Sequence, residues 1–513
     1  MIINIFHKHV KETPDKIALI VDQSQLTYRE LAQQVAAFSA TLETMGVKKG
    51  SHIAVILNNS VEFLVVMLAA ARLGAVIVPL NIALKSEFIL KAIKASDSRF
   101  AITSRHHLET ILSLDDIKKG NSLCIDDNEE GVLTYAKAIE NFPQAKLTVI
   151  TLTGDEHFIL TMTSGSTGDP KPIIFSQNTK IIRSYSARDC YHLDDSIVSL
   201  AATPLYHSLA QRLVLLPLLL GGTAVIMKHF KPKLWLEAVS DHKVTFSIPV
   251  SSQLANIFAE YIQGQYDVSS LRTLVSSSAL ISQELKEVLI DTFDCEIHEI
   301  YGTSEVGVVT NLAPIGSKKK LGTVGKALSG IDLKIVDDED KILPAGEKGE
   351  ITCKTPSSFI GYYKRPDETD KAMASGYFHT GDLGKLDKDG FLTFMGRKKD
   401  IIITGGINVY PEDIEKVLMG SALLKECAVI DVKDVHFGEA VLAVVVVKDP
   451  RNFNLRELQI LCMKKLADYQ QPLGYEILDE LPKNSMGKIM KPELRLQFKD
   501  LDLTKKLRSI INV

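Results

Sequence analysis

The stretch His52–Leu80, "HIAVILNNSVEFLVVMLAAARLGAVIVPL", decides the fold class of this chain. Its first residues, "HIAVIL", form a short apolar run typical of a buried strand, and "AVIVPL" at its end is a second such run. Between them, "EFLVVMLAAARL" is rich in helix-forming residues and stops at Gly74. Strand, helix and strand in this order predict a right-handed β-α-β unit with parallel strands.

The same alternation of strands and helices continues to about residue 310, with "GGTAVIM", "VTFSIP" and "LRTLVSS" as further strands. Upstream, Thr27 and Glu30 match the T-x-x-E capping box that begins a helix, and Gly46 follows where that helix would end. We therefore expect an α/β fold whose large N-terminal domain is built from parallel sheets layered with helices.

The pattern changes near residue 320. The segment "IDLKIVDDEDKILPAGEKGEITCK" predicts short strands around turns, so residues of about 320–398 are expected to form a small β-barrel-like unit. The charged, glycine-flanked link "GRKKD" then predicts a domain boundary, with an N-terminal domain over 1–398 and a small, mobile α+β C-terminal domain over 399–513. In the latter, a helix is predicted from Pro411, and a second after Asn454.

Composition narrows the possible partners. The chain has 513 residues, 63 acidic against 59 basic side chains and a net charge of −4, which gives no overall attraction to nucleic acid or to anionic membranes. Six cysteines lie far apart with no C-x-x-C pair, and neither a signal peptide nor an uninterrupted apolar run long enough for a membrane span is seen. A cytoplasmic protein is expected, and its oligomeric state stays open.

The stretch "TMTSGSTGDPKPI", Thr161–Ile173, resembles a phosphate-binding loop but fails both common glycine patterns. Gly165 and Gly168 are wrongly spaced for a P-loop, and the prolines oppose the helix that a P-loop requires. We expect strand "HFILTMTS", a loop and strand "PIIFS". Backbone N–H groups, hydroxyls and Lys171 could bind phosphate there, although an ordinary mobile hairpin is the simpler alternative.

Four further polar clusters are spread along the chain: "EIYGTSEVG", "SGYFHTGDLG", "GRKKD" and "LPKNSMGKIMK". Singly, each has an unremarkable interpretation, with Glu305 and Asp382 as turn carboxylates and Arg397 and Lys488 as surface cations. Asp382 is expected in a tight glycine turn and Lys488 in an exposed loop. Together with the hydroxyl-rich loop, a carboxylate for magnesium, a carboxylate for ribose hydroxyls and two cations indicate a site for a nucleoside triphosphate.

The order and spacing of these five motifs resemble the adenylate-forming superfamily, which comprises acyl- and aryl-CoA synthetases, adenylation domains of peptide synthetases and beetle luciferase. The resemblance extends from "PDKIAL" to "MGKIMK" and is strongest to the acyl-CoA synthetases. It implies an enzyme that uses ATP and Mg²⁺ to adenylate a small-molecule carboxylic acid, releases pyrophosphate, and then transfers the acyl group to CoA with release of AMP.

The resemblance also implies a role for each motif. Binding of ATP is expected from Thr163, Ser164, Gly165, Ser166, Thr167, Gly168, Lys171, Tyr301, Gly302, Thr303, Ser304, Asp382 and Arg397. Glu305 is expected to hold Mg²⁺, Lys488 to be the catalytic lysine of adenylation, and Lys399 to be the hinge of the C-terminal domain. Gly405 and Gly406 are expected to line the CoA channel. The chain departs from the common family pattern at Ser304, Ile407 and Pro172.

The resemblance places "PLYHSLAQRL", Pro204–Leu213, beside the acid pocket. The family's Gly-Gly-Ala-Pro loop, along which the adenine lies, is matched only loosely by "SSSAL", which includes Ser278 as a candidate substrate-site residue. His207 and Ser208 stand where amino-acid-activating relatives often place an aspartate, which disfavours an amino acid. His207 is expected to be an aromatic wall of the pocket. Apolar stretches such as "SIPVSSQLANIF" favour a fatty or aromatic carboxylate. Arg212 could meet a second carboxylate of a dicarboxylic acid, but capping a surface carboxylate is the favoured interpretation.

Two other functions fit the sequence. An adenylating enzyme that loads a carrier protein in trans would keep every residue named above. A non-catalytic adenylate-binding protein is also conceivable, although the retention of Lys171, Glu305, Asp382, Arg397 and Lys488 argues against it.

Overall fold

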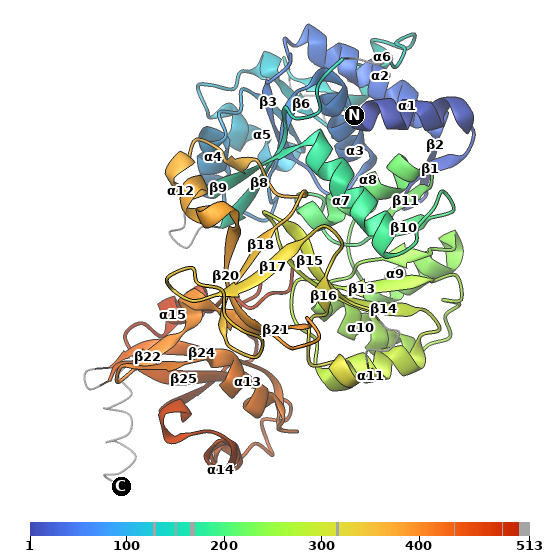
Figure 1. Cartoon of the computed structure of the whole chain (residues 1–513). Helices are drawn as coiled ribbons and strands as arrows, with labels where there is room; N and C mark the ends of the chain where they lie inside the picture. Colours follow the sequence, from blue (N-terminus) through green and yellow to red (C-terminus); the bar gives the residue numbers. More distant parts are fainter. Residues whose placement is uncertain are drawn as a thin grey trace. The chain divides into compact units, whose positions relative to one another are not determined.

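The computed structural model describes residues 1–126, 130–148, 151–164, 170–313, 318–434, 437–484 and 486–501. The chain forms two compact units (Figure 1). The first comprises Met1–Asp332 with Lys354–Gly376, and the second comprises Leu333–Cys353 with the chain from Tyr377 onward.

Two large sheets form the frame of the first unit. One has nine strands in the order β16 (Lys326–Ala327), β15 (Gly307–Leu312), β14 (Glu296–Thr303), β13 (Thr273–Ser276), β12 (Phe246–Ser247), β10 (Val198–Ala201), β11 (Thr223–Ile226), β1 (Ile17–Val21) and β2 (Ser24–Thr27). The other has eight strands in the order β19 (Gly361–Tyr362), β9 (Pro170–Ser176), β8 (His157–Ser164), β4 (Val76–Pro79), β3 (His52–Ile56), β5 (Phe100–Thr103), β6 (Ser122–Cys124) and β7 (Leu133–Thr134).

The β-α-β unit predicted from His52–Leu80 is confirmed. Strands β3 and β4 are parallel neighbours, and helix α3 (Val61–Leu73) connects them. The hydroxyl of Ser60 accepts from the backbone N–H of Phe63 at its start, and Gly74 ends it with φ +67°. The predicted capping box of Thr27 and Glu30 likewise begins α2 (Tyr28–Thr44).

Helices cover both faces of both sheets (Figure 1). Helices α1 (Ile2–Glu12), α2, α3, α7 (Gln177–Cys190) and α8 (Ser208–Leu220) share one core with strands of both sheets. Helices α4 (Ser86–Ala95) and α5 (Arg105–Leu112) cover the other face of the eight-stranded sheet. Helices α9 (Pro232–His242), α10 (Ser251–Tyr261) and α11 (Gln283–Thr292) do so for the nine-stranded sheet. Double burial explains why the central strands read as apolar runs. The short helix α6 (Tyr135–Glu140) packs against α2 and places Ala138 in the shared core, and α12 (Pro366–Ala372) contacts β19.

The second unit contains a four-stranded sheet, β17 (Asp332–Val336), β18 (Gly349–Lys354), β20 (Phe378–Leu386) and β21 (Leu392–Arg397). It also contains a five-stranded sheet made of β23 (Ile407–Val409), β22 (Ile402–Thr404), β25 (Gly438–Val447), β24 (Leu424–Asp434) and β26 (Gly474–Ile477). Its helices are α13 (Pro411–Met419), α14 (Leu455–Lys465) and α15 (Lys491–Gln497). The predicted helix start at Pro411 and the Asn454 cap of α14 are both confirmed.

The β-rich region of residues 320–398 is divided more finely than we predicted. Strand β16 extends the nine-stranded sheet and β19 extends the eight-stranded sheet, whereas the remaining four strands pair with one another. These four strands share a compact unit with the C-terminal elements because β21 packs against α13. The domain boundary at residue 399 stays a prediction. No helix of the described ranges is both long and apolar enough to cross a bilayer.

Candidate active site

The two strands predicted on either side of residues 165–168 are confirmed. Strands β8 and β9 form an antiparallel pair in which Thr163 lies opposite Lys171. Strand β9 begins at Pro170, two residues before the predicted "PIIFS". The loop residues Gly165, Ser166, Thr167 and Gly168 lie outside the described residues, as do the side chains of Thr163 and Ser164.

Lys171 is connected to Glu305 through an aromatic side chain. The ammonium group of Lys171 lies 3.4 Å from the centroid of the Tyr362 ring and 2.9 Å from a carboxylate oxygen of Glu368. The hydroxyl of Tyr362 donates to Oε1 of Glu305 at 3.0 Å. Lys171 and Glu305, which were predicted from separate motifs, are thus brought together by Tyr362. Its ring makes a cation–π contact with Lys171, and its hydroxyl makes a charge-assisted hydrogen bond to Glu305.

Sequence analysis missed Tyr362 and Glu368. Both lie in "FIGYYKRPDET", whose strand β19 pairs with β9 and so places Tyr362 beside the hairpin. Hydrogen bonds from Arg365 and then Lys171 lower the pKa of Glu368, so this carboxylate is charged at neutral pH. Burial, and then the charge of Glu305, raise the pKa of Tyr362, which keeps its hydroxyl a donor. A cluster of two tyrosines and two basic residues before a helix-starting proline was the available signal.

The "YGTSE" motif forms the end of β14 and the tight turn into β15, rather than a segment after the strand. Tyr301 is buried, Ser304 is exposed, and the hydroxyl of Thr303 is buried with no hydrogen-bond partner in the described ranges. A Cβ atom at Gly302 would overlap the carbonyl oxygen of Gly307, so only glycine fits there. Gly302, which was predicted to bind ATP, is therefore also required for the close approach of β14 and β15.

Glu305 is held in place through its backbone. Its carbonyl oxygen accepts from the N–H of Phe359 and from Nη2 of Arg183, each at 2.7 Å. No group of three or more His, Cys, Asp or Glu side chains suited to a metal ion occurs among the described residues. Mg²⁺ commonly binds one or two protein carboxylates together with substrate phosphates. A single carboxylate at Glu305 fits an ion that arrives with ATP.

His207 directly precedes α8, where its ring lies 4.6 Å from that of Tyr206. Burial lowers the pKa of His207 to about 4, so it is neutral at physiological pH, as expected of a pocket wall. Ser278 follows β13 with φ +77°, a left-handed conformation that glycine adopts most easily. This backbone conformation is one reason why the loose match to a glycine-containing family loop occurs here.

In the second unit, Asp382 and Arg397 are paired as predicted. They lie opposite each other on β20 and β21, with Nε of Arg397 3.3 Å from Oδ1 of Asp382. Asp382 is buried within β20 and is not in a turn, which corrects the predicted placement. Gly381 has φ +68° and lies beside a register shift of the sheet, so the glycine signal marked a bulge.

Lys488 lies in an exposed segment, as predicted, and Asn484 holds it by accepting from its backbone N–H at 3.0 Å. Partial desolvation of the ammonium group, and then Arg397, lower the pKa of Lys488, whereas Asp382 acts in the opposite direction. Because these interactions require proximity, the second unit brings together three residues that were predicted from separate motifs.

Gly405 and Gly406 form the two-residue turn between β22 and β23, with φ +55° and +81°. Positive φ at both positions is the requirement of a type I′ hairpin turn. Lys399 is exposed within a short 3₁₀ turn, Lys398–Asp400, that follows Arg397. The structure therefore gives the two glycines a conformational role in addition to the predicted one.

A hairpin with Lys171 next to the Glu305 carboxylate, and an Asp382–Arg397 pair next to Lys488, are the groupings expected of an ATP-dependent enzyme that activates acids. Family comparison agrees: residues 6–363 match the AMP-binding enzyme family, and residues 413–488 match the C-terminal domain of AMP-binding enzymes. The chain belongs to this adenylate-forming family, and within it to the AMP-forming acid–thiol (CoA) ligases.

Three relatives show what this chain is similar to. Feruloyl-CoA synthase from Amycolatopsis sp. is 31% identical, and the match covers 96% of this chain and 98% of the relative. The ATP-bound structure of MatB from Rhodopseudomonas palustris superposes with a TM-score of 0.88 at 26% identity, covering 98% and 100% of the two chains. o-Succinylbenzoate CoA synthetase from Bacillus subtilis, in complex with its acyl-adenylate, gives 0.86 at 26% identity, covering 96% and 98%.

Proposed function

We propose that this chain adenylates an aromatic or dicarboxylic acid with ATP and passes the acyl group to CoA, using the residues located above. The observation that carries the proposal is the Lys171–Tyr362–Glu305 contact, because it joins two motifs that the sequence assigned independently to the phosphates and the metal of ATP. The grouping of Asp382, Arg397 and Lys488 supports it from the second unit.

In the first step, a carboxylate oxygen of the acid attacks the α-phosphorus of ATP. The bond from that phosphorus to the bridging oxygen breaks, and pyrophosphate leaves with the electron pair. Lys171 and the hydroxyls of the β8–β9 hairpin are assigned to the β- and γ-phosphates, Asp382 and Arg397 to the ribose, and Lys488 to the charge that develops between the acid and the α-phosphate. Glu305 would hold Mg²⁺, which would offset negative charge on the phosphates.

In the second step, the CoA sulfur attacks the acyl carbon, the mixed anhydride bond breaks, and AMP leaves. We assign the Gly405–Gly406 hairpin to the CoA channel and Lys399 to the hinge between the two steps. The neutral ring of His207 suits a wall beside an aromatic or apolar acid. A fatty acid remains the alternative substrate class.

A cytoplasmic location is part of the proposal. It is supported by six cysteines that form no disulfide, with Cys124, Cys353, Cys427 and Cys462 buried. The net charge of −4 supports the absence of a nucleic-acid partner.

The test is a panel of aromatic, dicarboxylic and fatty acids, scored for pyrophosphate release and acyl-CoA formation with and without CoA. An aromatic or dicarboxylic acid that yields both products supports the proposal. Pyrophosphate release without acyl-CoA would instead indicate another acceptor, such as a carrier protein, and absence of both products with every acid would refute it.

A further inference from the structure

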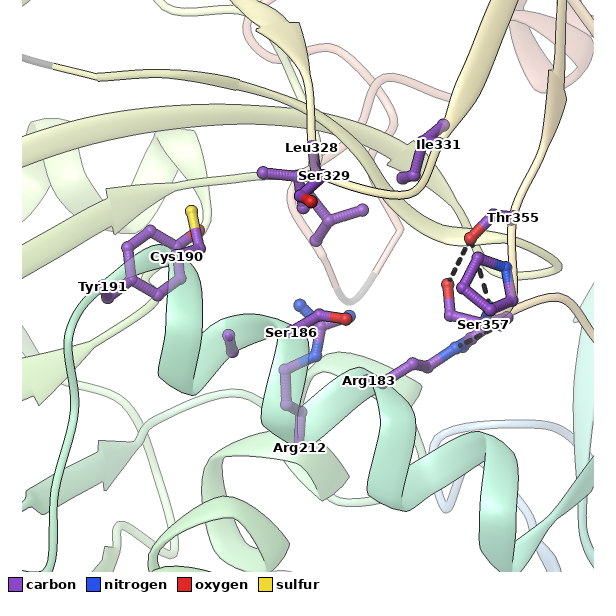
Figure 2. A pocket seen from close by; sticks show the side chains of 13 residues that line it. Arg183, Ser186, Cys190, Tyr191, Arg212, Leu328, Ser329, Ile331, Thr355 and Ser357 are labelled. Carbon is purple, nitrogen blue, oxygen red and sulfur yellow. Dashed lines mark hydrogen bonds between the residues drawn. The ribbon is translucent and has the colours of Figure 1, made fainter.

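A pocket in the first unit lies between helices α7 and α8, the β14–β15 hairpin and two loops (Figure 2). Its walls are mixed: Tyr191, Val308, Leu328 and Ile331 supply apolar surface, and serine, threonine and arginine side chains supply polar surface. The guanidinium group of Arg212 points from α8 into this space beside Ser186, and Arg183 extends along another wall toward Ser357 (Figure 2).

Two buried arginines line this pocket, and a buried lysine lies on helix α7 outside the lining. The exposed fractions of Lys180, Arg183 and Arg212 are 3%, 5% and 9%. Arg183 and Arg212 line the pocket, whereas Lys180 does not. No aspartate or glutamate side chain is part of the described lining. A buried guanidinium group whose charge no lining carboxylate compensates is energetically costly unless an anion completes the site.

Two of the three cations have neutral partners. Nζ of Lys180 donates to Oε1 of Gln211 at 2.8 Å and to the hydroxyl of Ser208 at 3.1 Å. Arg183 donates to the carbonyl oxygens of Ser357 at 3.0 Å and of Glu305 at 2.7 Å. Burial lowers the pKa of Lys180 well below its ordinary value, and the nearby carboxylate of Glu305 partly compensates the charge of Arg183.

Arg212 differs from the other two. In the part of the chain that the structure describes, it makes neither a hydrogen bond nor an ion pair, and its Nε is fully buried. Tyr191 and Cys190 are the lining groups that have a negative form, but burial raises the pKa of both, so that the hydroxyl and the thiol stay neutral. The favoured sequence-based interpretation, that Arg212 caps a surface carboxylate, is wrong because the side chain is buried.

The pocket adjoins the residues assigned to ATP. Val308 in its wall and Glu305 belong to the same hairpin segment, and Arg183 contacts both the pocket and the backbone of Glu305. A single acid could therefore place one carboxylate near the reacting nucleotide and its other end in the pocket. The apolar part of the wall, which includes Tyr191, Leu328 and Ile331, suits a ring or hydrocarbon spacer between the two ends.

We propose that Arg212, together with Arg183, binds a second carboxylate at the end of the acid opposite the one that is adenylated. This inference rests on the proposed function and narrows its substrate class to dicarboxylic acids with an apolar spacer. Planar guanidinium groups bind carboxylates through two parallel hydrogen bonds, and Arg212 has its donors available for that geometry.

The test uses matched acids that differ only in a terminal carboxylate, for example 3-phenylpropanoate against its 4-carboxy derivative and hexanoate against adipate. kcat/KM is measured by pyrophosphate release for the wild type, Arg212→Met, Arg212→Lys and the control Arg188→Met. Arg188 lies on the same helix as Arg183, pairs with Asp189 at the surface and does not line the pocket.

The wild type should prefer the dicarboxylate of at least one pair by about 100-fold or more. Arg212→Met should lose about 100-fold with that dicarboxylate and change the monocarboxylate less than about 3-fold. Arg212→Lys, which keeps the charge but not the planar donors, should fall between them, and Arg188→Met should match the wild type. The melting temperature of Arg212→Met should equal or exceed that of the wild type, because an uncompensated buried charge is removed.

Two results would overturn the inference and leave the proposed function intact. One is a wild type that adenylates monocarboxylates as well as their dicarboxylic partners. The other is an Arg212→Met variant that keeps the dicarboxylate preference. Absence of pyrophosphate release with every acid would refute the proposed function, and the inference with it.

Discussion

At the scale of single residues, Tyr362 places one ring and one hydroxyl between two charged side chains. The ring faces the ammonium group of Lys171, and the hydroxyl donates to Glu305. The two contacts can be separated by mutation, because phenylalanine keeps the ring and removes only the hydroxyl. Tyr362 therefore offers a test of how firmly Glu305 must be held.

Tyr362→Phe should lower kcat/KM for ATP by about 5- to 10-fold, since a hydrogen bond to a charged group contributes roughly 1.5–3 kcal/mol and only part of that is specific to the bound nucleotide. The measurement is the initial rate of pyrophosphate release at varied MgATP. The matched control is Tyr363→Phe, whose hydroxyl donates instead to Asp97 at 2.9 Å. Equal effects of the two substitutions would contradict the assigned role.

Glu412 provides a pH dependence at the same scale. Burial raises the pKa of Glu412 from 4.5 to about 7, with Lys491 opposing the shift. Because the folded state holds this proton more tightly than the unfolded state, the neutral carboxyl stabilises the fold below pH 4.5, and that stability is lost as the pH rises through about 7. The shift sets an upper limit of about 3 kcal/mol.

Glu412→Gln should therefore remove part of the fall in melting temperature of the wild type between pH 5 and pH 8, and should be the more stable protein at pH 8. Thermal unfolding across this pH range is the measurement, with the exposed Glu493→Gln as control. Parallel melting curves for Glu412→Gln and the wild type at every pH would count against the raised pKa.

At the scale of elements, the β14–β15 hairpin carries the "YGTSE" motif, and its tightness depends on a glycine. The two strands approach so closely at Gly302 that a methyl group there would meet the backbone of Gly307. Displacing this turn would move Glu305 and Thr303 together. The geometry of the candidate metal carboxylate is thus a property of the hairpin as well as of one side chain.

Gly302→Ala should reduce adenylation by more than about 10-fold, because misplacement by roughly 1 Å is costly in an oriented site. Gly322→Ala is the control, since a Cβ atom there lies 4.0 Å from its nearest neighbour, the flexible side chain of Gln283, and φ is not positive. Pyrophosphate release is measured for both variants. Full activity of Gly302→Ala would show that the hairpin adjusts at no functional cost.

Local sequence patterns predicted the helices and strands better than they predicted which strands pair with one another. The sequence of His52–Leu80 contains all that a β-α-β unit requires, and the caps at Thr27 and Asn454 are encoded within a few residues, so these predictions are confirmed. Strand β19 is only two residues long and pairs with β9, which is remote in sequence. No local periodicity could reveal that pairing, and with it Tyr362 and Glu368 were missed.

At the scale of the whole molecule, the predicted site residues fall into two groups, one in each compact unit. The first unit holds Lys171 and Glu305, and the second holds Asp382, Arg397 and Lys488. The sequence motifs predicted these five residues. They could not predict that Arg212 is buried without an acidic partner in the pocket lining, because that depends on packing from several elements. The environment of the Arg212 charge is therefore a feature that only the structure could reveal.

The proposed hinge predicts unequal effects on the two half-reactions. Lys399→Pro fixes φ at this position and should slow acyl transfer from a supplied acyl-adenylate to CoA at least about 10-fold more than it slows adenylation. Lys399→Ala, which removes the charge and keeps backbone freedom, should affect neither step to that extent. Equal losses in both steps for the proline variant would place the hinge elsewhere.

The central claim is that the acid is activated as an adenylate before CoA takes part, with Lys488 assisting that step. Acid-dependent exchange of labelled pyrophosphate into ATP, measured without CoA, tests it most directly. The account predicts exchange by the wild type only when the acid is present, and its loss in Lys488→Ala, which still converts a supplied acyl-adenylate to acyl-CoA. Exchange that requires CoA, or near wild-type exchange by Lys488→Ala, would contradict it.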